Sequence, residues 1–300
     1  MNEKISEKAH EIVIDELFSR FFILGGSVWV YDLKTNEKIA RLNDISYPTC
    51  VCVSRKNNMV FVQSTDGRFA FYTADSLTFL GKLKIRGCQN TDEDFYYDEE
   101  ENIVYGIFIC SRGDGGVGYG LAELYPDKLQ YSTIYLPQLD LEREKQDGEK
   151  PYTRYAFHKH AKGGYYIIRN WYNVGAGAAR IYENCYGRFE KEGKALVLKE
   201  KLLRNCERTL EKMDITEGEN AAYIYKFCKT IEREYFVRIR KNERGLFLIT
   251  SKAVYHLLSD GEFEEVCRGE YISDYAEFGG RRYICAWNRC LVRDMEKDPL

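Results

Sequence analysis

Hydrophobic and polar residues alternate along this chain in short runs, and two of these runs repeat with almost the same spacing. Residues 26–42 begin with glycine, alternate through a strand that ends at Tyr31, cross a polar turn and end at Leu42. Residues 67–83 repeat this pattern without a gap, with Tyr72 in the place of Tyr31. Alternation with a period of two on both sides of a polar turn predicts a β-hairpin.

Further copies of this hairpin predict a repeat architecture. Residues 120–136 and 250–266 match with Tyr125 and Tyr255 in register, and a copy near Tyr182 has a longer turn. Two more strand candidates precede each hairpin, so each unit has four strands. A four-stranded sheet cannot bury both of its faces alone, whereas sheets stacked around an axis cover one another. We therefore expect an all-β fold, a β-propeller with four-stranded antiparallel blades.

The hairpin at residues 26–42 resembles the third strand, turn and fourth strand of WD-repeat and YVTN-type propellers. The resemblance covers about residues 20–84, and the Gly-His and Trp-Asp dipeptides of WD repeats are absent. It implies a binding scaffold and identifies no partner.

The number of blades depends on the last part of the chain. The interval between in-register tyrosines grows along the sequence and is longest between Tyr182 and Tyr255. Within this interval, Leu203, Cys206, Leu210 and Met213 have the spacing of an amphipathic helix, and residues 221–229 form a strand candidate. We expect six blades with a helical insertion near 199–213, and seven blades remain the alternative.

Residues 1–300 are expected to form a single propeller domain whose ring is closed by the N-terminal segment. The C-terminal unit lacks a fourth strand, and the N-terminal residues would supply it and protect the exposed sheet edge. The alternative is a helix within residues 1–20, because Ile5, Ala9, Ile12 and Val13 also suit a helix face.

The composition limits the classes of partner. The net charge of -3 argues against nucleic-acid binding, and no apolar run is long enough for a membrane span. The N-terminal residues are charged and show no signal peptide, so we expect a cytoplasmic protein whose 10 cysteines are reduced. The oligomeric state is not indicated.

No motif identifies a catalytic residue, a cofactor or a metal. Residues 113–118 match GxGxxG but lie between two strand candidates, so they are interpreted as a loop rather than a dinucleotide site. His158 and His160 share one strand face without a third ligand, and the acidic run at 92–101 lacks the spacing of a calcium loop.

Two groups of residues are the candidates for binding. Four predicted first strands start with a charged residue followed by an aromatic one, and the charges would form a polar collar at one end of the channel. They are Asp94, Arg154, Glu234 and Asp274. The alternative is that these charges are simply solvated. The second group lies in the aromatic-rich residues 152–172 and comprises His158, Arg169 and Trp171, residue types that favour interfaces. The alternative is that the aromatic residues of this segment pack between blades.

These features lead to two functional hypotheses. The first is a non-enzymatic scaffold that binds a protein or peptide on one face of the propeller. The alternative is a hydrolase or lyase that acts on a carbohydrate or a small polar ligand in the central funnel, a hypothesis based on fold analogy.

Overall fold

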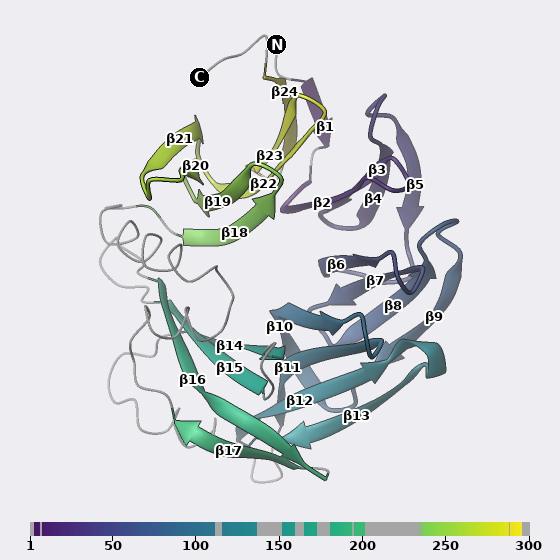
Figure 1. Cartoon of the computed structure of the whole chain (residues 1–300). Coiled ribbons are helices and arrows are strands. Elements are labelled where there is room, and N and C mark those ends of the chain that lie inside the picture. The colour runs from purple at the N-terminus through teal and green to yellow at the C-terminus, as the bar shows by residue number, and fades with distance from the viewer. Residues whose placement is uncertain are drawn as a thin grey trace. The chain divides into compact units, whose positions relative to one another are not determined.

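The computed structural model consists almost entirely of short strands, which form six four-stranded sheets among the residues that it describes (Figure 1). These are residues 3–6, 8–111, 116–136, 152–159, 165–172, 181–193, 195–201, 234, 236–287 and 289–295. Within these ranges the only helical element is one 3-10 turn, Pro126–Lys128. The chain divides into two compact units, residues 1–52, 176–179 and 222–300, and residues 53–175 and 180–221.

The first unit contains three sheets. The first sheet comprises β2 (Glu11–Asp15), β3 (Arg20–Leu24), β4 (Val28–Asp32) and β5 (Lys38–Leu42). The second comprises β18 (Phe236–Asn242), β19 (Gly245–Thr250), β20 (Ala253–Leu257) and β21 (Phe263–Arg268). The third has the order β1 (Glu3–Ser6), β24 (Arg289–Asp294), β23 (Arg281–Ala286) and β22 (Ile272–Phe278).

The second unit contains the other three sheets, and its boundary falls within β6. One sheet comprises β6 (Pro48–Ser54), β7 (Met59–Ser64), β8 (Arg68–Thr73) and β9 (Phe79–Lys84). The next comprises β10 (Cys88–Asp98), β11 (Ile103–Ser111), β12 (Val117–Tyr125) and β13 (Gln130–Tyr135). The last comprises β14 (Tyr152–Lys159), β15 (Tyr165–Tyr172), β16 (Ile181–Glu192) and β17 (Ala195–Lys201).

The predicted repeat is present at the level of individual residue pairs. Val30 pairs with Ala40 and Tyr31 with Lys38, so β5 bulges by one residue at the repeated tyrosine. Tyr72 and Tyr255 mark the same register shift in their hairpins. All three tyrosines are buried. Tyr125, by contrast, pairs with Gln130 without a shift.

The N-terminal segment supplies the fourth strand of the last sheet, as predicted. β1 pairs with β24 in antiparallel orientation, and Ile5 packs against the adjacent hydrophobic cluster. Pairing with β1 covers the edge that β24 would otherwise expose. The alternative of a helix within residues 1–20 is wrong, because residues 3–6 and 11–15 are strands. Closure of the whole chain into a single domain stays a prediction.

The predicted helical insertion falls largely outside the described residues. β17 continues to Lys201, so the first residues of the predicted 199–213 segment are strand and no helix begins at 199. Residues 202–213 and the strand candidate at 221–229 lie outside the described residues. The choice between six and seven blades therefore stays a prediction.

The core of the first unit lies between the faces of neighbouring sheets. Phe247, Ile249 and Val254 pack in one cluster with Tyr275 and Ile284 of the last sheet. Tyr275 is almost completely buried and contacts Phe247 with ring centroids 5.4 Å apart. This packing holds the second and third sheets of the unit together. The turns at the two ends of their strands therefore lie next to each other and can form candidate sites.

Candidate functional site

One edge of these two sheets brings together charged and aromatic side chains. The β19–β20 turn at Ser251 and Lys252 is joined to the connection between β21 and β22 by backbone hydrogen bonds. Gly269 N donates to Lys252 O (2.8 Å), and Ile272 N donates to Ser251 O (2.9 Å). In the third sheet, Trp287 N donates to Tyr271 O (3.3 Å). We call residues 250–252, 268–271 and 287 the Trp287 edge.

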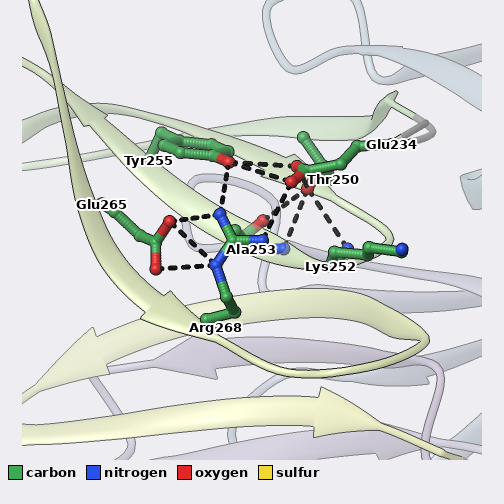
Figure 2. Close-up of polar contacts among 7 residues, drawn as sticks. All are labelled: Glu234, Thr250, Lys252, Ala253, Tyr255, Glu265 and Arg268. Carbon is green, nitrogen blue, oxygen red and sulfur yellow. Dashed lines mark hydrogen bonds and ion pairs between the residues drawn. The ribbon is translucent and has the colours of Figure 1, made fainter. Parts of the chain in front are cut away.

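Glu234, a predicted site residue, lies at the centre of a polar cluster on the second sheet (Figure 2). Thr250 Oγ1 donates to Glu234 Oε2 (2.7 Å), and the Tyr255 hydroxyl lies 3.1 and 3.2 Å from the two carboxylate oxygens. Arg268 NH1 donates to Glu234 Oε1 (3.0 Å), while its Nε contacts both oxygens of Glu265 at 3.0 Å. The cluster thus links residues from the end of β19, from β20 and from β21.

The electrostatics of this cluster follow from partial burial. Burial raises the pKa of Tyr255 to about 12, and the adjacent Glu234 carboxylate adds to the rise. The hydrogen bonds to Glu265 and Glu234 raise the pKa of Arg268. The side chain of Glu234 is only 9% exposed, whereas that of Arg268 is 52% exposed. Arg268 therefore presents a fixed guanidinium group to the surface.

Two exposed aromatic residues lie on the same edge and touch each other. Tyr271 is 63% exposed and Trp287 54% exposed, and their ring centroids are 4.1 Å apart in an edge-to-face arrangement. Both have left-handed backbone conformations, with φ of 54° at Tyr271 and 53° at Trp287. This conformation is unfavourable for a bulky residue. Large rings thus occupy strained positions without being buried.

Asp274, the second predicted site residue with a described side chain, has a different environment. It is fully buried on β22, where it accepts a hydrogen bond from Ile12 N (2.9 Å). Arg240 holds it through two hydrogen bonds, and Arg240 NH2 also lies 3.2 Å from Glu11 Oε1. Burial alone would lower the pKa of Arg240, but the charges of Asp274 and Glu11 outweigh it and raise the pKa. This triad links the first strands of three sheets.

The two described members of the predicted collar thus have different cationic partners, Arg268 for Glu234 and Arg240 for Asp274. The idea that Asp274 is simply solvated is wrong, because its side chain is fully buried. A buried carboxylate requires a cation and hydrogen-bond donors, which Arg240 and Ile12 N supply. Asp94 lies on β10 and Arg154 on β14, but their side chains are outside the described residues. The four-residue collar stays a prediction.

The aromatic-rich segment gives a similar result. His158 lies on β14, and Arg169 and Trp171 lie on β15, in strands that pair with each other as predicted. Their side chains are outside the described residues, so their role in binding also stays a prediction. His160 and residues 113–115 of the glycine-rich motif are outside the described residues as well. In the acidic run, Asp98 accepts hydrogen bonds from the backbone of Glu100 and Glu101 and so stabilises a turn.

Sequence reasoning missed Tyr271, Trp287, Arg240 and Arg268. One signal was available for Trp287. Ala286 pairs with Arg289 across a two-residue hairpin turn, and Trp287 is the first residue of this turn. Such turns require positive φ and favour Asn and Gly, so a tryptophan there is anomalous. Arg240 had no comparable signal, because its partners are distant in sequence.

The described residues indicate neither a metal centre nor a membrane-spanning helix. Among them, no group of three or more His, Cys, Asp or Glu side chains is placed to bind a metal ion. No helix found among them is long and apolar enough to cross a membrane.

Comparison with known proteins identifies the fold. No family model matches the chain, and no curated protein matches it in sequence. The β-propeller domain of Cps50 (Swd1) from Myceliophteria thermophila is similar in structure, with a TM-score of 0.53 and 10% identity over 98% of this chain and 99% of that chain. The WD40 repeats of RRP9 give a TM-score of 0.52 with 9% identity, over 97% and 96% of the two chains.

A third similar structure is that of U3-55K, with a TM-score of 0.53 and 8% identity over 97% of both chains. Identities this low establish the fold and nothing about the partner. With the four-stranded sheets and the repeated hairpins, these similarities show that the chain has a WD-repeat-like β-propeller fold.

Proposed function

We propose that this chain is a non-enzymatic scaffold that binds a protein partner through the Trp287 edge. Its structural neighbours include WD40 propellers, a kind of fold suited to protein interaction scaffolds. The observation that carries the proposal is the pair Tyr271 and Trp287, whose exposed rings touch each other in left-handed backbone conformations.

The strain at these positions supports a role in binding rather than in folding. A left-handed conformation costs a bulky residue about 1–2 kcal/mol, and glycine would avoid the cost. Directly before β10, where the chain makes a similar connection between sheets, the left-handed residue is Gly87, with φ of 75°. A ring that is held in a strained conformation and left exposed offers a rigid anchor for a partner surface, as tyrosine and tryptophan do at interface hot spots.

The charged groups beside the rings define the partner further. Arg268 and Lys252 are exposed on this edge, and Glu265 is exposed beside them. An interface with an aromatic centre and a charged rim is typical of protein–protein contacts. We therefore expect a partner that inserts apolar side chains against the rings and places complementary charges around them.

The catalytic alternative has less support among the described residues. Glycoside hydrolysis requires paired carboxylates that are free to exchange protons with the substrate. Glu234 and Asp274 are instead each held by an arginine, and Asp274 is fully buried.

The test compares tagged wild-type protein with the Trp287→Ala variant as baits in the native host. We expect wild type to retain a stoichiometric partner and Trp287→Ala to lose at least about 90% of it, because a hot-spot residue contributes about 2 kcal/mol or more. Tyr135→Ala, which removes another exposed ring from β13, is the matched control and should retain the partner. Equal retention by wild type and Trp287→Ala would refute the assignment of this edge.

A further inference from the structure

The opposite edge of the same sheets contains a cavity of about 530 Å³. Antiparallel strands place the β18–β19 and β22–β23 turns at the end away from Ser251 and Trp287. The cavity is lined by the first strands β2, β18 and β22, by the turns that follow them, and by Phe247 and Met295. Its volume lies in the range of ligand-binding pockets.

The lining of this cavity combines apolar side chains with charged and polar ones, among them Arg240, Arg244 and the buried carboxylate of Glu277. Ile12, Ile14, Phe278 and Met295 contribute apolar surface. Glu277 has a side chain that is only 5% exposed, and its Oε1 accepts hydrogen bonds from Arg244 NH1 (2.7 Å) and from the Tyr275 hydroxyl. Among the described residues, its Oε2 has a single long contact, 3.4 Å from Asn242 Nδ2. A carboxylate oxygen accepts about two hydrogen bonds, so Oε2 has capacity for a donor from a ligand.

Two more carboxylates line the mouth of the cavity. Glu16 follows β2 and Glu243 follows β18, and both residues are exposed. Among the described residues, neither carboxylate takes part in a hydrogen bond or ion pair. Including the residues directly behind the lining, five carboxylates face three guanidinium groups. The carboxylates are Glu11, Glu16, Glu243, Asp274 and Glu277, and the guanidinium groups are Arg240, Arg244 and Arg282.

We propose that this cavity binds the basic side chain of a lysine or arginine presented by a peptide. Apolar side chains beside an excess of carboxylates over guanidinium groups are complementary to an alkyl chain with a cationic head. The alkyl stem would lie against Ile14, Phe278 and Met295, and the head would donate to Glu277 Oε2 between Glu16 and Glu243. The site lies at the edge opposite Tyr271 and Trp287, so it does not depend on the proposed function.

Calorimetric titration of the full chain at low ionic strength tests this proposal. The probes are a Gly-Lys-Gly peptide blocked at both ends, its arginine counterpart, and the isosteric peptide with norleucine in place of lysine. Butylamine serves as the free amine. We expect saturable binding of both basic peptides and at least tenfold weaker binding of the norleucine peptide. Added salt should lower the affinity for the basic peptides.

Glu16→Gln and Glu243→Gln remove the two carboxylates at the mouth without disturbing any partner in the described structure. Each variant should lower the affinity for the lysine peptide by about threefold to tenfold, and the double variant should lower it further. Glu264→Gln, which removes an exposed carboxylate on β21 that does not line the cavity, is the matched control and should bind like wild type.

Several results would overturn the proposal. Equal affinity for the norleucine peptide would show an apolar pocket without charge selection. Unchanged binding by both glutamine variants would place the ligand elsewhere. Binding of butylamine without binding of either basic peptide would make the cavity a site for a free amine, and the absence of saturable binding by any probe would remove the site altogether.

Discussion

At the scale of single residues, the chain repeats a strained backbone position with different side chains. Tyr47 precedes β6, Gly87 precedes β10 and Tyr271 precedes β22, and their φ angles are 53°, 75° and 54°. The connection between sheets thus imposes the same left-handed geometry in each case. Glycine adopts it without cost, whereas a tyrosine must be held there by the surrounding structure.

Two single substitutions, one at Tyr47 and one at Gly87, should change stability in opposite directions. Tyr47 is 76% exposed, so Tyr47→Gly loses little packing and should raise the free energy of unfolding by about 0.5–1 kcal/mol through relief of strain. A Cβ at Gly87 would meet no atom within 4 Å, so Gly87→Ala should lower it by about 1 kcal/mol through conformation alone.

Denaturant unfolding of both variants and of wild type measures these changes. Destabilisation by Tyr47→Gly would show that the exposed ring makes a folding contribution larger than the strain. The strain argument for Tyr271 and Trp287 would then lose its basis as well.

The residues of the ionic triad show what sequence reasoning can and cannot reach. Asp274 was found because a charged residue before an aromatic one recurs at the starts of strands, and Tyr275 indeed packs in the core. Its partner Arg240 was missed because Arg238 and Arg240 are two residues apart on β18 and have equivalent positions in the alternating pattern. Only the placement of the strand decides which of the two contacts Asp274. Glu11 is separated from Arg240 by 229 residues, and no local pattern connects them.

At the scale of elements, the strands were predictable because alternation has a local cause. Successive side chains of a strand point to opposite faces, so Val28 and Val30 of β4 are buried while Trp29 between them is partly exposed. The strand β2 was less clear, since Ile12 and Val13, together with Ile5 and Ala9, also suit a helix face. Its pairing with β3 decided the outcome, and a tertiary contact of this kind cannot be derived from local propensity.

The polar cluster on the second sheet should make stability sensitive to alkaline pH. The pKa of Tyr255 is about 12 in the folded chain and about 10 in the unfolded chain. Between these values the unfolded chain loses the proton first. The contribution of neutral Tyr255 is therefore intact below about pH 10 and is lost as the pH rises from about 10 to about 12.

Tyr255→Phe removes this titration together with the hydrogen bonds of the hydroxyl to Glu234 and Arg268. The variant should be about 1 kcal/mol less stable than wild type at pH 8, and the difference should shrink as the pH is raised to 11. Urea unfolding at both pH values measures it, with Tyr271→Phe as the control for loss of an exposed hydroxyl. A difference that stays constant with pH would show that Tyr255 titrates equally in both states.

At the scale of the whole molecule, the fold and the sites were predictable to different degrees. The fold follows from a repeated unit, and each copy adds evidence for the same architecture. A binding site occurs once, and its members lie on turns and strands that are far apart in the chain. The Trp287 edge and the cavity each depend mainly on residues of the last two sheets, where the resemblance to WD repeats does not extend.

Placing two sites on opposite edges of the same sheets predicts that they act independently. The strands between them belong to well-packed sheets that share the Phe247 and Tyr275 core. Coupling between sites requires an element whose equilibrium both ligands change.

Trp287→Ala should therefore leave the affinity for the lysine peptide unchanged within about twofold, and the double variant Glu16→Gln with Glu243→Gln should leave partner retention unchanged. Calorimetry and quantitative retention measure the two effects. A loss of partner in the double glutamine variant would instead mean that one partner spans both edges and inserts its basic side chain into the cavity.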